Sequence, residues 1–196
     1  MRLFIGSGNP GKISDWRKYF PTWDVLSYED LGLDKIEVEE GIDSLEENAK
    51  KKALAWAAAS GEVTLSDDTG FFVNALGGFP GVSVKRWGGR FEKEMNKPEL
   101  LQYLKNETEN IDDLSCYFQS AYAIANPDGA VQSFSNKLDG RLDWSFFGQG
   151  FQYNFAFGTV FKVDRIDKTW RQMTIEEKRE ADSEVIRKIK KIVKTF

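Results

Sequence analysis

The chain of 196 residues contains no histidine and only one cysteine, Cys116. The missing imidazole excludes Ser-His and Cys-His nucleophile pairs, histidine metal ligands and imidazole acid-base catalysis. A single cysteine excludes a disulfide within the chain and a thiolate cluster for zinc or iron. Cys116 lies in the apolar stretch SCYFQSAYAIA, and we interpret it as a buried strand thiol. Any catalysis must therefore use carboxylates, lysines and a hard metal ion.

Long apolar runs and an excess of basic residues are also absent. No segment approaches the length needed to span a bilayer, and the N-terminus MRLFIGSGN lacks the pattern of a signal peptide. We therefore expect a cytoplasmic protein with no membrane partner. The formal net charge of -4 argues against binding a nucleic-acid polymer, because that requires a concentrated basic face. One small anionic ligand in a local basic pocket is still allowed.

No Pro- or Ser-rich linker divides the chain, so we expect residues 1–196 to form a single domain, in which two lobes are allowed. The aromatic residues are numerous, with six Trp and fifteen Phe. They predict a wide core or cleft lined by aromatic rings.

Strand-like and helix-like segments alternate along the chain. The apolar run 2–7 is followed by the loop GSGNPGK and then by apolar residues at helical spacing, which predicts a strand, a loop and a helix. Ser44, with Glu47 three residues later, predicts the start of a second helix, and Gly61 predicts its end.

Residues 62–66 predict a strand that ends directly before Asp67 and Asp68, at the kind of position where open α/β sheets bind their ligands. Further elements are predicted as a helix opened by Pro98, a hairpin turning at 126–129, a strand at 158–164 and one final helix capped by Thr174 with Glu177. The chain is therefore expected to be an α/β protein with a mixed sheet flanked by helices.

Three acidic residues at the expected entrances of strands and helices are candidate ligands for a hard cation: Glu40, Asp67 and Asp68. Magnesium is typically held by one or two carboxylates together with substrate phosphates, so this small set is sufficient.

The loop SGNPGK offers groups suited to phosphate oxygens, namely backbone N–H groups at a helix start, the Asn9 amide and the Lys12 ammonium. It is not a Walker A loop, because the GxxxxGK[ST] spacing is absent. Lys52 on the second helix is a candidate second cation. Together these features describe a site for a metal-bound polyphosphate.

Each feature also has a purely structural interpretation. The sequence DDTG can form a turn with an Asx cap, and SGNPGK can be an ordinary connection from strand to helix. Glu40 can belong to a charged loop, and residues 50–52 can form an exposed helix face.

Taken together, the segments resemble the motifs of one family, the inosine triphosphate pyrophosphatases, which are house-cleaning NTP diphosphatases. The segments SGNPGK, EEGIDSLEENAKKKA and SDDTGFFVNALGGFPGVSVKR match in order and spacing over roughly the first ninety residues. Nearer the C-terminus, GFQYNFAF and DKTWRQMTIEEK resemble the family's GFGYDPIF and GKTxAEMxxEEK.

This resemblance implies an elongated α/β fold with a mixed sheet and a central cleft between two lobes, usually as a homodimer. It also implies Mg²⁺-dependent cleavage of a nucleoside triphosphate to its monophosphate and pyrophosphate. Glu40 would hold the metal, and Asp68 would hold metal or orient and deprotonate the attacking water, supported by Asp67. Contacts to the substrate are implied for Ser7, Asn9, Lys12, Lys52, Thr69 and Lys168.

The two motifs with which the family reads its purine are altered here. In the first motif, Phe151 and Tyr153 are retained and can stack on a base, whereas Asn154 replaces an aspartate. In the second, the family's Ser-His-Arg corresponds to Asp182, Ser183 and Glu184.

A guanidinium can only donate hydrogen bonds, whereas an ionised carboxylate can only accept them. If Glu184 faces the base, selectivity should therefore shift away from inosine and xanthine toward a base that presents exocyclic amino or ring N–H donors, such as guanine or a modified base. Alternatively, Glu184 lies on a solvated helix face.

Two other functions stay open: a nucleotide-binding or sensing protein with little or no turnover, and a phosphohydrolase acting on a non-nucleotide phosphate. The presence of Glu40, Asp68, Asn9 and Lys12 favours the enzyme, because a binding module has little need of every metal- and water-positioning group.

Overall fold

The computed structural model describes residues 1–149 and 156–196. The strands are β1 (Arg2–Ile5), β2 (Asp24–Leu26), β3 (Thr64–Val73), β4 (Pro80–Gly81), β5 (Ser115–Ala125), β6 (Val131–Leu142), β7 (Phe161–Val163) and β8 (Lys168–Thr169). The helices are α1 (Pro10–Tyr19), α2 (Leu45–Ser60), α3 (Lys97–Glu107), α4 (Ile175–Ala181) and α5 (Ser183–Val193). Short 3-10 segments are η1 (Asn74–Leu76), η2 (Val84–Arg86), η3 (Trp144–Phe146) and η4 (Phe157–Thr159).

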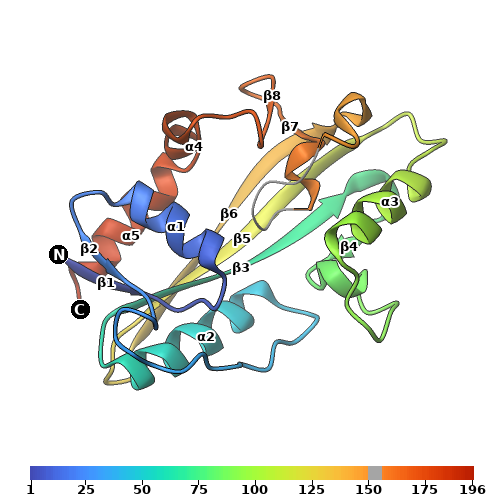
Figure 1. Ribbon diagram of the computed structural model, residues 1–196. Coiled ribbons are helices and arrows are strands. Elements are labelled where there is room, and N and C mark those ends of the chain that lie inside the picture. Colours follow the sequence, from blue (N-terminus) through green and yellow to red (C-terminus); the bar gives the residue numbers. More distant parts are fainter. Residues whose placement is uncertain (150–155) are drawn as a thin grey trace. The chain divides into compact units, whose positions relative to one another are not determined.

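Across the described residues the strands form one eight-stranded sheet in the order β2-β1-β3-β5-β6-β7-β8, with β4 paired to β3 (Figure 1). Strand β1 runs parallel to both β2 and β3. The pairs β3–β4, β6–β7 and β7–β8 are antiparallel. The predicted α/β fold with a mixed sheet and flanking helices is therefore confirmed.

The chain forms two compact units, each assembled from segments that are distant in sequence. The first unit consists of Met1–Asp68, Ser120–Asn136 and Ile175–Phe196, and the second of Thr69–Gln119 and Lys137–Thr174. Strands β3, β5 and β6 contribute residues to both units.

The core of the first unit joins α1 and α5 to strands β1, β3 and β5. Ile13, Trp16 and Phe20 recur at the spacing of one helix face and are buried there, as the sequence predicts. The other buried members of this cluster are Leu3, Ile5, Tyr19, Val25, Leu65, Tyr122, Ile124, Val185, Ile186, Ile189 and Val193.

Helix α2 begins and ends at the predicted residues. The Ser44 side chain accepts a hydrogen bond from the backbone N–H of Glu47, and Gly61 ends the helix in the left-handed conformation with φ 69°. Its buried stripe contains Ala49 and Ala53, whose small side chains let the helix lie close to its neighbours.

The core of the second unit is built largely from aromatic rings. Phe71 of β3 lies 4.6 Å, centroid to centroid, from both Phe118 of β5 and Phe157 of η4. Phe161 of β7 packs edge-on against Phe118 at 4.7 Å. The many aromatic residues of the sequence therefore serve here as core.

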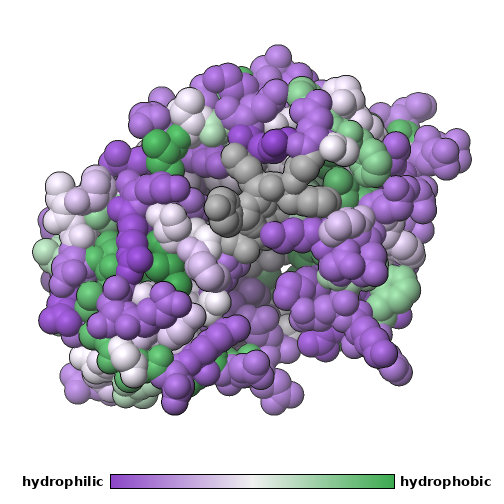
Figure 2. Space-filling view, viewed as in Figure 1, coloured by the Kyte–Doolittle hydropathy of each residue, from purple (hydrophilic) through white to green (hydrophobic). Residues whose placement is uncertain are grey.

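Hydrophilic residues dominate the face shown in Figure 2, and hydrophobic residues form small groups among them. Among the described residues, the large hydrophobic side chains that are exposed are Met1, Ile42 and Phe91. No helix in this part of the chain has both the length and the apolar composition needed to cross a membrane.

Strand β3 differs from its prediction. It continues through Asp67 and Asp68 to Val73 instead of ending before the aspartate pair, so the turn that DDTG can form is not present. The residues that follow supply the reason, because Phe71 and Val73 are fully buried and Phe71 and Phe72 pair with β4. Asp67 and Asp68 are therefore mid-strand residues.

The final helix also differs from its prediction, because it is broken into α4 and α5 at Asp182. This residue leaves the helical conformation, with φ -94° and ψ 13°. Its carboxylate accepts a hydrogen bond of 2.9 Å from the hydroxyl of Tyr19, the last residue of α1. The interruption is a local one, because the Asp182 N–H still donates to the carbonyl of Lys178 and the Asp182 carbonyl accepts from the N–H of Ile186.

Asp182 is a partly buried carboxyl with a shifted pKa. The pKa of Asp182 is raised to about 6, mainly by removal of the carboxyl from water and also by the charges of Asp67 and Asp15, while the Tyr19 hydrogen bond and Lys178 oppose the rise. On β5, Tyr122 also lies within the field of the Asp182 charge.

We expect Asp182→Asn to reveal this shift as a change of stability with pH. An unfolded aspartate has a pKa near 3.9. The free energy of unfolding of the parent should therefore fall by up to about 3 kcal/mol as the pH rises from about 4 to about 6. The variant keeps an acceptor for Tyr19 but has no carboxyl, so its free energy of unfolding relative to the parent should rise over that range. Urea unfolding at pH 4.5 and 7.5 measures this difference.

Tyr19→Phe provides the matched test, because it removes the hydrogen bond that stabilises the charged carboxylate of Asp182. The pKa of Asp182 should rise further, so the pH range over which stability is lost should move upward. A stability difference between Asp182→Asn and the parent that does not change with pH would contradict this interpretation.

Gly6, between β1 and the SGNPGK loop, is closely packed. A Cβ added there would lie 2.2 Å from Ser66 Oγ and 2.8 Å from Thr64 Cγ2. We expect Gly6→Ala to lower the free energy of unfolding by about 1–3 kcal/mol, because two neighbours must move. The control is Gly41→Ala, where the nearest atom is 3.7 Å away and the change should be below about 0.5 kcal/mol. Equal losses of stability for Gly6→Ala and Gly41→Ala, measured by thermal unfolding, would refute the prediction.

Candidate functional site

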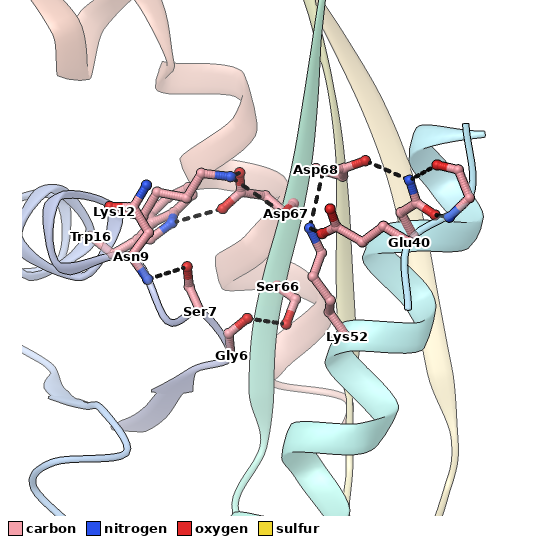
Figure 3. A network of polar contacts seen from close by, with 12 residues as sticks. Gly6, Ser7, Asn9, Lys12, Trp16, Glu40, Lys52, Ser66, Asp67 and Asp68 are labelled. Atoms are coloured by element: carbon pink, nitrogen blue, oxygen red, sulfur yellow. Dashed lines mark hydrogen bonds and ion pairs between the residues drawn. The ribbon is translucent and has the colours of Figure 1, made fainter. Parts of the chain in front are cut away.

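The site is organised by the alternation of side chains along β3. Because consecutive residues of a strand point to opposite faces, Asp67 and Asp68 lie on opposite sides of it (Figure 3). Each aspartate meets a lysine from a different helix, Lys12 of α1 and Lys52 of α2. All four residues belong to the first unit.

On the α1 side, Lys12 Nζ lies 2.6 Å from Asp67 Oδ2. Trp16, one turn later on α1, donates its indole N–H to Asp67 Oδ1 at 3.5 Å. Only 8% of the Asp67 side chain is exposed. Burial alone would raise the pKa of Asp67, but the Lys12 charge and hydrogen bond outweigh it and lower the pKa. Asp67 is thus a charged group that holds the Lys12 ammonium in place.

On the α2 side, Lys52 Nζ lies 3.0 Å from Asp68 Oδ1 and 2.7 Å from Glu40 Oε1. Burial would lower the pKa of Lys52, but the charges of Asp68 and Glu40 outweigh it and raise the pKa. The two carboxylates therefore converge on one positive charge, although Glu40 belongs to a loop and Asp68 to a strand.

Asn48 connects these two acids. Its Nδ2 donates to Asp68 Oδ2 at 2.9 Å and also to the carbonyl of Gly41, while its Oδ1 accepts from the backbone N–H of Gly41. The amide thus fixes the chain beside Glu40 and orients the Asp68 carboxylate at the same time.

The sequence interpretation assigned no role to Asn48 or Trp16. For Asn48 the available signal was an amide on the buried stripe of α2, between Leu45 and Ala49. Trp16 gave no polar signal, because its position fits the apolar face of α1.

The loop before α1 presents its polar groups at the start of the helix. Asn9 Oδ1 accepts from the backbone N–H of Gly11 at 3.0 Å, and Ser7 Oγ accepts from the N–H of Asn9 at 3.2 Å. Pro10 occupies the first helical turn, where its missing N–H leaves no bond unmade. The result is an ordered helix N-terminus next to the Lys12 ammonium, which suits an anion.

The residues present fit a hard divalent cation of the magnesium type. Glu40 and Asp68 supply carboxylate oxygens that already surround a positive charge, the Lys52 ammonium. Among the described residues, no group of three His, Cys, Asp or Glu side chains can hold a metal by itself. A metal here would therefore need oxygens from substrate phosphates and water.

The other predicted site residues belong to α5, to the second unit, or to the part of the chain outside the described residues. Glu184 is 60% exposed and pairs on its own helix with Lys188 at 3.1 Å and with Arg187 at 3.9 Å. Ser183 is the first residue of α5. Thr69 and Lys168 are assigned to the second unit. Phe151, Tyr153 and Asn154 fall outside the described residues.

Comparison with known proteins places these residues in a family context. The sequence model of the Ham1 family matches residues 3–188. A dITP/XTP pyrophosphatase of Staphylococcus aureus is 32% identical over 177 residues, which cover 90% of this chain and 87% of that relative. A dITP/XTP pyrophosphatase of Thermus thermophilus is 33% identical over 183 residues, covering 91% and 84%.

Solved structures show the same likeness in three dimensions. The Ham1 protein of Staphylococcus aureus superposes with a TM-score of 0.74 at 28% identity, covering 97% of this chain and 98% of that one. A HAM1 protein from Coxiella burnetii gives a TM-score of 0.77 over the full length of both chains, and at 19% identity it supports the fold alone. The family resemblance predicted from the sequence is confirmed, and the chain belongs to the Ham1 family.

Proposed function

We propose that this protein is a Mg²⁺-dependent nucleoside triphosphate pyrophosphatase that hydrolyses NTPs or dNTPs to the monophosphate and pyrophosphate. The observation that carries the proposal is the convergence of Glu40, Asp68 and Lys52 beside the second pair, Lys12 and Asp67. The names of the Ham1-family relatives, dITP/XTP pyrophosphatases, support the same reaction class.

The lysines and the loop serve to bind the triphosphate. Lys12 and the N-terminus of α1 attract phosphate oxygens, and Lys52 adds a second positive charge. Glu40 and Asp68 would hold Mg²⁺, which supplies neutralisation of the phosphate charge when bound. Phosphoryl transfer depends mostly on positioning and charge, so this set is sufficient without a histidine.

Asp68 is also the group best placed to orient the attacking water and take its proton. Its carboxylate is held at one oxygen by Asn48 and at the other by Lys52, so its direction is fixed. Attack of the water oxygen on the α-phosphorus breaks the bond to the bridging oxygen, and pyrophosphate leaves. Thr69 and Lys168 stay proposed substrate contacts.

Asp68→Asn should lower kcat by at least about a hundredfold, because the amide can still accept from Lys52 but cannot take a proton. Release of pyrophosphate from an NTP in the presence of Mg²⁺ measures turnover, and thermal unfolding shows whether the fold is retained. The control is Glu47→Gln, which removes a carboxylate of α2 that pairs with Lys50 outside the site.

The product separates the alternatives. Pyrophosphate indicates the proposed enzyme, orthophosphate indicates a phosphohydrolase, and tight binding with no product indicates a sensing protein. Undiminished turnover by Asp68→Asn would remove this residue from the mechanism.

We further propose that base selectivity differs from that of the dITP/XTP pyrophosphatases. The Ser-His-Arg motif by which the family reads purines is replaced by Asp182, Ser183 and Glu184, so its cationic donors are missing. Glu184 lies on an exposed face and pairs with Lys188. The proposed change in selectivity therefore rests on the missing cationic donors and not on a new acceptor at Glu184. A purine carbonyl that is buried in the complex without a hydrogen-bond donor costs about 1–3 kcal/mol of binding free energy.

The expected kcat/KM for ITP and XTP is therefore about ten- to a hundredfold below that of a family member with the intact motif. A panel of NTPs and dNTPs measures it and includes GTP, whose base carries the exocyclic amino donor that hypoxanthine and xanthine lack. Glu184→Arg reintroduces a donor and should raise the value for ITP selectively. A clear optimum for ITP or XTP in the parent chain would overturn the selectivity proposal.

We also propose, as the sequence predicts, that residues 1–196 form a single domain, that the protein is a homodimer and that it is cytoplasmic. Sedimentation velocity tests the dimer directly.

A further inference from the structure

A lysine outside every predicted motif lies on the phosphate-binding loop. The side chain of Lys35, from the loop after β2, packs against Gly8, the second residue of SGNPGK. A Cβ built on Gly8 would lie 2.2 Å from Lys35 Cε, 3.0 Å from Cδ and 3.2 Å from Cγ. Gly8 therefore leaves the space through which the Lys35 stem passes. Its ammonium, one bond beyond Cε, lies at the loop.

The charge of Lys35 is not offset by an acid. Among the residues that the structure describes, the Lys35 ammonium has no partner in an ion pair or a hydrogen bond, and its side chain is exposed. Lys12 and Lys52, by contrast, are bound to Asp67, Asp68 and Glu40.

Charge balance shows why this difference matters. The two ion-paired lysines face three carboxylates, so this cluster carries one net negative charge before any ligand binds. A triphosphate adds several more negative charges. Lys35 is a cation at the loop whose charge is not shared with an acid when it meets a phosphate.

An exposed lysine usually has no role beyond solvation, and its stem often covers neighbouring surface. Here the covered surface is the glycine of a loop whose N–H groups and helix N-terminus suit an anion, and Lys35 and Gly8 belong to the same unit.

We propose that Lys35 is a third triphosphate-binding cation, laid over Gly8 of the SGNPGK loop. It contacts the polyphosphate and not the base, so it increases affinity equally for all bases. Because this contact is present in both the ground state and the transition state, it lowers KM and leaves kcat unchanged. The inference rests on the proposed function of this site.

The test uses Lys35→Met, which keeps the stem over Gly8 and removes the charge. We expect KM for NTPs to rise about tenfold at low salt, with kcat changed less than about twofold and the same ratio for every base. The increase should shrink at high salt, because screening weakens the contact in the parent. Lys35→Arg keeps the charge and should stay close to the parent.

The matched control is Lys51→Met, which removes the same charge from an exposed position of α2. Equal effects of Lys35→Met and Lys51→Met would mean that only the net charge matters, and would overturn the proposal. A change in kcat without a change in KM would also overturn it.

A second measurement does not depend on turnover. Calorimetry with inorganic tripolyphosphate should show about tenfold weaker binding for Lys35→Met than for Lys51→Met. If the protein binds tripolyphosphate in this way but releases no pyrophosphate from NTPs, the enzymatic function fails while the role of Lys35 stands. If turnover is normal and Lys35→Met binds tripolyphosphate as the parent does, or the parent binds none, the role of Lys35 fails.

Discussion

The alternation of side chains at Asp67 and Asp68 is the constraint on which the site depends. Two adjacent carboxylates in the middle of a largely buried strand must point to opposite faces, and each is costly to bury without a positive partner. The partners come from different helices, Lys12 of α1 and Lys52 of α2. The two ion pairs therefore attach both helices to one strand and place two ammonium groups on either side of it.

These ion pairs are suited to a ligand with many negative charges. The charges of Asp68 and Glu40 raise the pKa of Lys52, and Asp67 holds Lys12 by an ion pair, so the positions of both ammonium groups are set before a substrate arrives. Preorganised charges of this kind require little rearrangement on binding. Asn48 and Trp16 complete the arrangement as neutral donors, since each holds one aspartate oxygen without changing the charge of the site.

The features that the sequence predicted well are local ones. Ser44 and Gly61 at the ends of α2, and the loop before α1, depend on backbone hydrogen bonds within a few residues, which sequence patterns describe directly. The mixed sheet also follows from the order of strands and helices. The convergence of Glu40 with Asp68 was expected from the residue types together with the family resemblance, because a loop and a distant strand share no local pattern.

The errors came from tertiary contacts that override local signals. Thr69 and Gly70 favour a turn in isolation, yet pairing with β4 and burial of Phe71 keep β3 extended. The apolar stripe before and after Asp182 suggested one helix, and only the distant Tyr19 hydroxyl explains the break. The same break leaves Asp182 partly buried while Glu184, two residues later, is exposed on α5.

The position of the aspartate pair within β3 has a consequence for how this chain can diverge. A single replacement near the pair keeps the length of the strand, and neighbouring side chains can adjust to it. An insertion or deletion of one residue before Asp67 would instead exchange the faces of everything that follows, so that each carboxylate would meet the wrong helix. Over evolutionary time, residue identity in this stretch is therefore freer to drift than segment length.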